Sequence, residues 1–510
     1  MRSERVVVIG AGVGGLVAAL ELAAQGVEVA VVERAAAPGG KMREVLVGGR
    51  PIDAGPTVFT MRWVFEEIFA DAGTSLADHV TLQPVEILAR HAWSETERLD
   101  LFADRERSAE AIGAFAGPDG AQGFRDFCQR AERIYRTLEG PFIRADRPSP
   151  LGLVRGAGLG QMFRIAPFAT MWQALGEHFR DPRLRQLFGR YATYCGSSPF
   201  QAPATLMLVA HVEQEGVWLV EGGMHRLAVA LAGLAAAKGA TFHYGAEAGD
   251  MLMRGGRVVG VALGSGDQLE ADAVVVNGDV AAVADGRFGH EAARVVPQVP
   301  PAKRSLSAVT WNLLAETKGF PLVRHTVFFT DDYSAEFADI LQHKRLPRAP
   351  TVYVCAQDRT DRDEASPDGP ERLLCLVNAP ATGDSDPFDA AEIEACAERT
   401  FGHLACCGLR VARRPETTAV TTPADFARMF PATGGALYGQ ASHGWQASFN
   451  RPGTRTKLPG LVLAGGSTHP GPGVPMAALS GRLAARTLLS GFASTSRSRK
   501  TAMPGGMSTR

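Results

Sequence analysis

The sequence has little of several features that mark particular classes of protein. Its seven cysteines form no C-x-x-C pair and no metal-ligand spacing, and Cys406 and Cys407 are immediate neighbours. This scatter argues against a disulfide framework or a zinc site and fits a reducing compartment. No uninterrupted run of about 18 apolar residues occurs, so we expect no transmembrane helix. The formal net charge of −1 provides no long-range attraction to nucleic acid, and we expect no nucleic-acid partner.

What the sequence does contain, close to its start, is a glycine-rich turn between a strand and a helix. Residues 6–9 are an apolar run suited to a strand buried on both faces, residues 16–25 have apolar positions at helical spacing, and residues 27–32 predict a second strand. The turn reads G-x-G-x-x-G, and an acidic residue follows the second strand. This βαβ unit predicts a dinucleotide site built by Gly10, Gly12, Gly14, Gly15 and Glu33.

Each residue of this motif has a physical reason to be there. Gly10 permits the tight turn, Gly12 lets a pyrophosphate approach the backbone, and Gly15 lets the helix and the strand pack closely. The N-terminus of the helix supplies N–H groups and the positive end of a dipole for the phosphates. Glu33 can accept hydrogen bonds from ribose hydroxyls. Both NAD and FAD fit these residues.

A second glycine-rich stretch follows the acidic residue closely and favours FAD. The sequence P-G-G-K stands at 38–41, and D-A-G-P-T stands at 53–57. Loops so close to the ribose indicate that the chain folds back over an extended, bulky dinucleotide. The order of these motifs resembles the FAD-binding segment of the amine-oxidase-like flavoproteins, in which the second loop lies near the flavin. The resemblance adds to the cofactor site Gly39, Gly40, Lys41, Gly55, Pro56 and Thr57.

Two later segments complete the same resemblance. Residues 218–279 contain an amphipathic helix, three short strand candidates and the sequence V-V-V-N-G-D, and in these flavoproteins this part returns to the nucleotide domain near the adenine. Residues 460–490 contain a buried strand, a loop rich in glycine and proline, and a helix whose dipole can face the pyrimidine edge of a flavin. His469 in this loop has no partner at ligand spacing, so we expect no metal. The two segments add Ala248, Asn277, Gly465, Gly466, Gly473, Val474, Pro475 and Met476 to the cofactor site.

We therefore expect an α/β fold, with a Rossmann-like FAD-binding domain and an inserted substrate portion made of a sheet and helices. Residues 108–214 look helical, and residues 290–420 contain strand-like runs such as T-V-Y-V-C-A. The polar end of the chain predicts a disordered tail. The expected divisions are 1–90, 215–285 and 420–490 for the discontinuous FAD domain, 91–214 and 286–419 for the substrate portion, and 491–510 for the tail.

The whole arrangement resembles the bacterial-type phytoene desaturase family of carotenoid desaturases and isomerases. The resemblance covers most of the chain. It is carried by the N-terminal unit, by G-G-M-H-R-L at 222–227, by T-P-A-D-F at 422–426 and by A-G-G-S-T-H-P-G-P-G-V-P at 464–475. Within the family, residues 53–66 are most similar to the 1-hydroxycarotenoid 3,4-desaturases. The resemblance implies bound FAD and a C3–C4 double bond introduced into an acyclic 1-hydroxy or 1-methoxy carotenoid.

Such a reaction does not require a strong acid or base from the protein. C4 is allylic to the polyene, so a hydride that leaves C4 toward the flavin generates a cation delocalised over the conjugated chain, and this cation acidifies the C3–H bond. A weak base then suffices, and the sequence shows no obvious catalytic dyad. Asp146 and Glu221 are candidate carboxylates, although surface or structural roles are more common for such residues. The catalytic residues stay unassigned, and positioning of the substrate would carry most of the effect.

Three other functions remain open from the sequence. The first is a phytoene desaturase or carotenoid isomerase of the same family. The second is an amine-oxidase-like enzyme, which would need an aromatic pair framing the flavin. The third is a non-catalytic escort protein that binds prenyl or lipid groups, and such a protein should lack the second flavin-facing loop. For an enzyme, the electron acceptor is oxygen or a quinone.

A water-insoluble carotenoid would reach its enzyme most easily from a bilayer. Residues 142–172 mix apolar side chains, among them Trp172, with several arginines. We expect this segment to form short helices and loops that bind the membrane surface, on a cytoplasmic enzyme peripherally associated with the inner membrane. The alternative is a helix pair that packs its apolar face inward. The arginines are Arg144, Arg147, Arg155 and Arg164.

Overall fold

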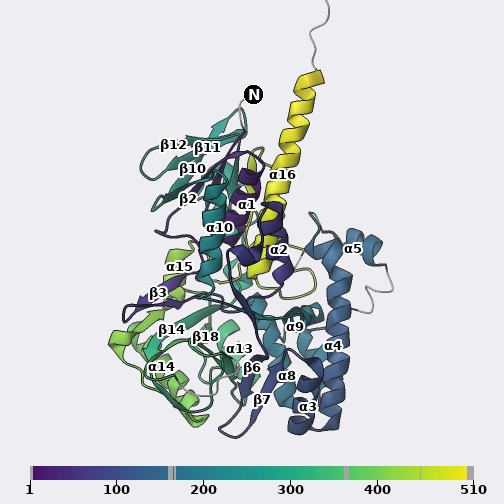
Figure 1. Cartoon of the computed structure of the whole chain (residues 1–510), viewed down its shortest axis with the longest axis vertical. Coiled ribbons are helices and arrows are strands. Elements are labelled where there is room, and N and C mark those ends of the chain that lie inside the picture. Colours follow the sequence, from purple (N-terminus) through teal and green to yellow (C-terminus); the bar gives the residue numbers. More distant parts are fainter. Residues whose placement is uncertain are drawn as a thin grey trace, which may run out of the picture.

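The computed structural model describes residues 4–501, except residues 147, 159–164, 166–167, 361–366 and 448. Figure 1 shows a region built on a parallel sheet in the upper half of the molecule, with a larger sheet and a helical region below it. Helix α16 (Val474–Thr501) runs upward through the parallel-sheet region.

Five parallel strands form the sheet of the upper region, in the order β21-β13-β1-β2-β9. The two central strands are runs of buried apolar residues, as strands covered on both faces require. Each of the three segments predicted to build the nucleotide domain contributes strands to this sheet. The strands are β1 (Arg5–Ile9), β2 (Glu28–Glu33), β9 (Thr241–Tyr244), β13 (Ala273–Val276) and β21 (Leu461–Leu463).

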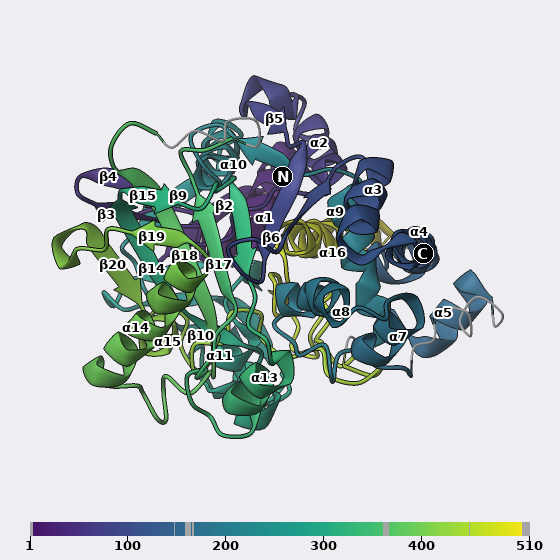
Figure 2. The same cartoon turned by 90° about the horizontal axis from the view of Figure 1, so that it is seen from below.

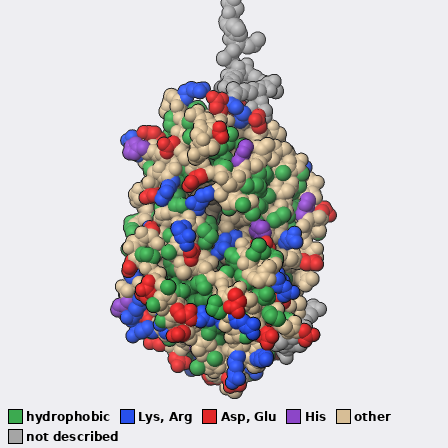
Figure 3. All heavy atoms as spheres, turned by 90° about the vertical axis from the view of Figure 1, so that its left-hand side faces the viewer, with side chains coloured by type: hydrophobic (Ala, Val, Ile, Leu, Met, Phe, Trp, Pro, Cys, Tyr) green, Lys and Arg blue, Asp and Glu red, His purple; other side chains and the backbone are tan. Residues whose placement is uncertain are grey.

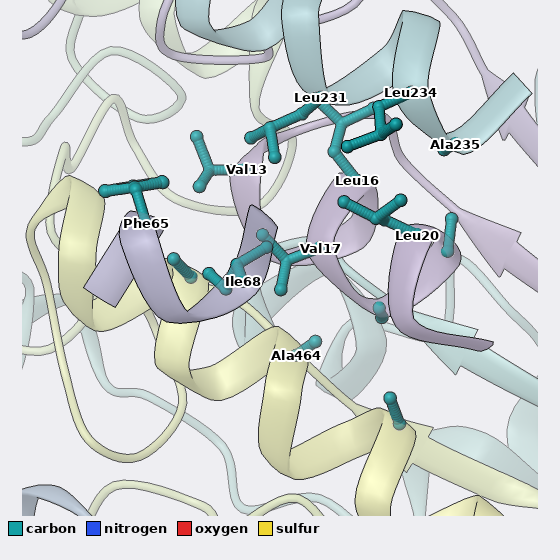
Figure 4. Close-up of a cluster of buried hydrophobic side chains, with 14 of the residues drawn as sticks. Val13, Leu16, Val17, Leu20, Phe65, Ile68, Leu231, Leu234, Ala235 and Ala464 are labelled. Carbon is teal, nitrogen blue, oxygen red and sulfur yellow. The ribbon is translucent and has the colours of Figure 1, made fainter. Parts of the chain in front are cut away.

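Helices cover one face of the parallel sheet, and a small antiparallel sheet covers the other. In Figure 4, Leu16 of the first helix meets Leu231 of a second helix, and Val17 of the first helix lies near Ile68 of a third. On the opposite face, Val261 belongs to a separate buried cluster with the strand residues. The helices are α1 (Val13–Ala24), α2 (Arg62–Asp71), α10 (His225–Ala237) and α16, and the small sheet consists of β10 (Ala248–Arg254), β11 (Arg257–Leu263) and β12 (Gln268–Glu270).

The larger sheet has seven strands in the order β20-β14-β18-β17-β16-β6-β7. Only β16 and β6 pair in parallel, and the other pairs in this sheet are antiparallel. Figure 2 shows this sheet from below, beside the helical region. Its strands are β6 (Ile87–Ala92), β7 (Arg98–Phe102), β14 (Ser307–Ala315), β16 (His325–Phe328), β17 (Val352–Ala356), β18 (Glu371–Ala379) and β20 (Thr418–Thr421).

Alternate residues of this sheet meet two different environments, because successive side chains of a strand point to opposite faces. Trp311, Val354 and Cys375 belong to a buried cluster that includes α14 (Ala390–Cys406). Their sequence neighbours Tyr353 and Leu376 line an internal cavity instead. The alternation therefore divides the sheet into a structural face and a cavity face.

The helical region lies between β7 and β8 in the chain, and residues 108–214 are largely helical as predicted. Its core is rich in aromatic side chains, including Phe127, Phe179 and Phe188, whose ring centroids lie 4.7–5.6 Å apart. The helices are α3 (Arg105–Ala116), α4 (Pro118–Leu138), α5 (Pro150–Ala157), α7 (Met171–His178), α8 (Pro182–Gly189), the 3-10 helix η3 (Arg190–Cys195) and α9 (Leu208–Gln214).

Short elements join these regions. Three two-stranded pairs are present, namely β3 with β4, β5 with β8 and β15 with β19. The bounds are β3 (Glu44–Val47), β4 (Arg50–Asp53), β5 (Leu82–Pro84), β8 (Trp218–Val220), β15 (Thr317–Gly319), β19 (Leu409–Val411), α11 (Val280–Ala284), α12 (His290–Ala293), α13 (Tyr333–Leu341) and α15 (Pro423–Met429).

Two details differ from the sequence-based divisions. The boundaries predicted at residues 90 and 420 fall inside β6 and β20, which both belong to the seven-stranded sheet. The predicted disordered tail is wrong from residue 491 to residue 501, because α16 continues to Thr501. Phe492 packs against the core of the nucleotide region, which gives the helix a reason to continue past residue 490.

Figure 3 shows acidic and basic side chains interspersed on the face in view.

Candidate functional site

A continuous cavity of about 920 Å³ connects the nucleotide region with the cavity face of the seven-stranded sheet and with the helical region. The predicted cofactor residues converge on it from three distant parts of the chain. All of them line the cavity except Gly15, which lies beneath the first loop. The structure therefore brings the sequence-predicted set together around one space.

The first glycine loop is shaped by close backbone approaches. Gly10 has a φ of +96°, which favours glycine. A Cβ on Gly15 would lie 2.1 Å from the carbonyl oxygen of Gly10, so only glycine fits between helix α1 and strand β1. Helix α1 has no side-chain cap and no acidic residue in its first turn, so its first N–H groups are left for an anion.

Asn277, at the end of β13, fixes the relative positions of the loops. Its side-chain N–H donates to the carbonyl of Gly10 at 3.2 Å. A Cβ on Gly12 would lie 2.8 Å from its amide nitrogen, and a Cβ on Gly14 or Gly465 would lie 2.7 or 2.8 Å from its amide oxygen. Three glycines are therefore needed around a single amide side chain.

Glu33 lies at the end of β2, where the motif predicts an acceptor for ribose hydroxyls. One carboxylate oxygen accepts the N–H of Ala11 at 2.6 Å, and the other accepts the N–H of Ala35 at 2.7 Å. A carboxylate has further acceptor capacity on each oxygen. Glu33 thus tethers the first loop to the end of β2, and its contact with a ribose stays a prediction.

The second glycine loop packs directly against the first. The N–H of Gly39 donates to the carbonyl of Ala11 at 2.8 Å. A Cβ on Gly55 would lie 1.9 Å from the carbonyl oxygen of Lys41, so the two halves of this loop touch through their backbones. The Lys41 ammonium donates to the carbonyl of Leu437 at 2.6 Å, and burial lowers the pKa of this lysine.

Asp53 anchors this loop to helix α10, a role that the sequence did not reveal. Its carboxylate accepts the backbone N–H groups of Met224 at 2.7 Å and His225 at 3.2 Å, at the start of the helix. Burial raises the pKa of Asp53, while these two hydrogen bonds lower it. The G-G-M-H motif therefore supports the second glycine loop from behind.

The third loop joins β21 to α16. Gly465 and Gly473 have φ values of +114° and +111°, and α16 begins immediately afterwards at Val474. Arg451 holds the loop against its neighbour by donating to the carbonyls of Tyr438 at 3.1 Å and Gly466 at 3.3 Å. The three loops form a cradle of backbone N–H groups and glycines that fits the extended dinucleotide of a flavin cofactor.

The remainder of the cavity is mostly apolar. Leu374 and Leu376 line it from the sheet, and Leu206 and Val209 line it from the helical region. The aromatic pair Phe168 and Trp445 also borders the cavity, with ring centroids 5.4 Å apart. These two side chains are 71% and 39% exposed, so they mark where the cavity reaches the surface. A long hydrophobic ligand fits such a space.

A polar cluster interrupts this apolar lining, and no sequence motif indicated it. Arg190, Tyr194 and Glu213 line the cavity from the helical region, and Tyr353 and His325 line it from the sheet. The hydroxyl of Tyr353 lies 2.6 Å from the hydroxyl oxygen of Thr57 and 2.8 Å from Nδ1 of His325. Burial and two nearby arginines lower the pKa of His325 to about 3, so this ring is neutral.

Three other side chains considered from the sequence, Asp146, Glu221 and His469, do not line the cavity. Asp146 and Glu221 are exposed. His469 donates from Nε2 to the carbonyl of Ala145 at 2.8 Å. Within the described part of the chain, no group of three or more His, Cys, Asp or Glu side chains could hold a metal ion. Cys195 does line the cavity, and burial raises the pKa of its thiol to about 11.

The predicted membrane-binding segment is only partly available at the surface. Arg147 and Arg164 lie outside the described residues. The Arg144 guanidinium stacks 3.9 Å from the Trp63 ring and pairs with a neighbouring carboxylate. Trp172 is half-buried and packs against the ring of Phe200. Arg155 is exposed.

Comparison with known proteins gives a consistent result. The family of flavin containing amine oxidoreductases matches residues 13–489. The chain is 58% identical to the hydroxyneurosporene desaturase of Rubrivivax gelatinosus, over 100% of this chain and 98% of that protein. It is 46% identical to the protein of the same name from Cereibacter sphaeroides, over 97% and 99% of the two chains. Among solved structures, an oxidoreductase from Methanosarcina mazei has a TM-score of 0.58 at 18% identity and covers 95% of this chain and 100% of its own.

Proposed function

The chain belongs to the family of flavin-containing amine oxidoreductases, and from this premise we propose that it is an FAD-dependent carotenoid 3,4-desaturase. The membership confirms the predicted α/β fold class and makes the protein a flavin-dependent oxidoreductase. The proposed substrates are acyclic carotenoids with a hydroxyl or methoxy group at C1. The name shared by the relatives at 58% and 46% identity supports this substrate class.

The observation that carries the proposal is the single cavity that joins the dinucleotide cradle to an apolar space. FAD rather than a smaller flavin is supported by the three loops, which offer a helix N-terminus for a pyrophosphate and an acidic residue for a ribose. When bound, FAD would supply the acceptor for a hydride. An escort protein without redox chemistry has no need of the second loop, which is complete here.

The chain's own residues bind, orient and shield the substrate. The apolar walls formed by the helical region and the cavity face of the sheet hold an extended chain and exclude water from the reacting carbons. Loss of hydride from the allylic C4 leaves a delocalised cation, and the acidified C3–H bond then needs only a weak base.

Pigment analysis tests the proposal directly. The protein should be purified and its flavin identified, and it should then be supplied with a hydroxyneurosporene and with phytoene. We expect bound FAD and faster desaturation of the hydroxylated substrate. Equal or faster turnover of phytoene would place the protein elsewhere among the carotenoid desaturases. A protein that binds no flavin would favour the escort function.

We also propose that the enzyme is cytoplasmic and takes its substrate from the inner membrane as a peripheral protein. Among the described helices, none is both long and apolar enough to cross a bilayer. The exposed rings of Phe168 and Trp445 at the edge of the cavity, together with the exposed Arg155, support docking there.

Vesicle flotation tests this docking. Wild type should float with vesicles of anionic lipid, and Phe168→Asp combined with Arg155→Glu should weaken flotation without loss of flavin. Leu46→Asp is the matched control, because Leu46 is 76% exposed but lies on the β3–β4 pair and does not line the cavity. Unchanged flotation of the double variant would remove this face from the docking surface.

A further inference from the structure

The cavity holds a charged side chain that a pure hydrocarbon substrate would not need. Arg190 begins η3, and Arg190, Thr193 and Tyr194 of this 3-10 helix line the cavity, with Arg190 and Thr193 at positions i and i+3 on one face. Placing a guanidinium in an apolar space costs free energy unless a partner compensates it. The nature of the partner therefore indicates what the cavity binds.

Other groups of the protein compensate the buried charge of Arg190 only in part. One guanidinium N–H donates to the hydroxyl of Tyr194 at 2.9 Å. The guanidinium carbon lies 5.0 Å from the ring centroid of Tyr194 and 5.3 Å from that of Tyr353. Among the described carboxylates, none is an ion-pair partner of Arg190, and the nearby Glu213 accepts hydrogen bonds from two tyrosine hydroxyls instead. Because a guanidinium has five N–H donors, most of them remain for a ligand.

The position of Arg190 matches the end of the proposed substrate that lies next to the flavin. The ring of Tyr353, against which Arg190 stacks, carries a hydroxyl 2.6 Å from Thr57 of the flavin-facing loop. In the carotenoid, C1 is separated from the reacting C4 by only three bonds. A substrate whose C4 faces the flavin must therefore place its C1 oxygen close to this loop.

We propose that Arg190 recognises the oxygen at C1 of the carotenoid and thereby selects hydroxylated or methoxylated ends over hydrocarbon ends. This inference rests on the proposed function. Arginine suits both end groups, because it only donates hydrogen bonds, and a hydroxyl and an ether oxygen both accept them. A carboxylate in the same place would bind the hydroxyl alone. Tyr194 positions the guanidinium, and its link to Glu213 holds the phenol in turn.

A competition assay tests the role of Arg190. Purified holoenzyme is given equal amounts of hydroxyneurosporene and of neurosporene, which lacks the C1 oxygen, and the ratio of the two kcat/KM values is measured. Arg190→Met keeps the length of the side chain but removes its charge and its donors. We expect this ratio to fall by about tenfold to a hundredfold, mainly through slower turnover of the hydroxylated substrate.

Three further variants test whether the change in preference is specific to Arg190. Arg185→Met removes an arginine that stacks 4.7 Å over Trp172 but does not line the cavity, and it should retain the wild-type ratio. Arg190→Lys should keep part of the preference, because it retains the charge without the planar fork. Tyr194→Phe should lower the ratio less than Arg190→Met does, and it carries the test if Arg190→Met fails to bind flavin.

The possible failures can be told apart. A wild type that desaturates neither carotenoid refutes the proposed function. A wild type that prefers the hydroxylated substrate, combined with an Arg190→Met or Tyr194→Phe holoenzyme of unchanged preference, overturns only the role of Arg190.

Discussion

Substitution of two glycines in the first loop, Gly12 and Gly15, should impair the protein for different reasons. Gly12 has an ordinary φ of −72°, and a Cβ there would meet only the side-chain amide of Asn277, at 2.8 Å. Gly15 lies against backbone, because its Cβ would be 2.1 Å from the carbonyl oxygen of Gly10. We expect Gly12→Val to lose the flavin and to destabilise the fold less than Gly15→Ala does, because a side-chain amide can shift more easily than backbone.

The magnitudes follow from these contacts. Gly15→Ala overlaps an oxygen by more than 1 Å relative to ordinary van der Waals contact, so α1 must move away from β1, at a cost of about 1–3 kcal/mol. Gly12→Val places a branched side chain where the pyrophosphate would approach. Each hydrogen bond to a charged group that is lost costs about 1.5–3 kcal/mol, which lowers flavin affinity by about tenfold or more.

The assay measures two quantities for each variant, the flavin-to-protein ratio from the absorption spectrum and the urea midpoint of the apoprotein. Gly233→Ala is the matched control, because this position in α10 has no atom within 4 Å of the added Cβ. A Gly12→Val protein with full flavin occupancy would refute the placement of the pyrophosphate at the first loop. Equal urea midpoints for Gly15→Ala and the control would refute the packing argument.

Three further predictions concern buried ionisable groups. Burial lowers the pKa of His91 and His325 to about 3, so the unfolded chain binds these protons first as the pH falls. Stability should decrease below about pH 6.5 by about 1.4 kcal/mol per pH unit for each histidine, and equal urea midpoints at about pH 7 and pH 5 would contradict this. Arg359→Met should lower the free energy of unfolding by about 3–5 kcal/mol, because it leaves the fully buried carboxylate of Glu371 without its ion-pair partner. Arg413→Met removes a partly exposed ion pair with Glu394 and should lower it by less than about 1 kcal/mol. Urea unfolding measures both changes, and similar values for the two variants would contradict the argument. The pKa of the Cys195 thiol, about 11, leaves little thiolate to attack a flavin, so we expect the flavin to be bound non-covalently. Acid precipitation of the protein should then release all of the flavin into the supernatant. Flavin retained in the pellet would indicate a covalent bond.

The glycine loops could be predicted from the sequence because their requirements are local. Gly10 needs a positive φ, Gly15 needs a missing Cβ, and both are expressed within one short motif. Asn277 came instead from the resemblance of the V-V-V-N-G-D sequence to the flavoproteins, and its contacts with the glycines appear only in the assembled fold. The bounds of the regions could not be predicted as well. Strand β6 belongs to the larger sheet through its parallel pairing with β16, which is far away in the chain, so no local sequence pattern shows this membership.

The polar cluster could not be predicted, because its members come from regular elements with no motif of their own. The alternation in V-Y-V places Tyr353 opposite its buried neighbours, but only the assembled sheet shows that this face lines a cavity. Arg190 has no local signature at all. For the segment at 142–172, composition did not show that Arg144 and Trp172 have partners within the protein, because these contacts form only through tertiary packing.

The charge of Arg190 also constrains how a carotenoid would lie in the cavity. Loss of hydride leaves a positive charge on the substrate, and two unit charges about 4 Å apart repel by about 4 kcal/mol at the effective dielectric constant of a protein surface. Delocalisation lowers this repulsion if the polyene extends away from the guanidinium, toward the apolar lining and the opening at Phe168 and Trp445. The substrate should therefore enter with its C1 end first.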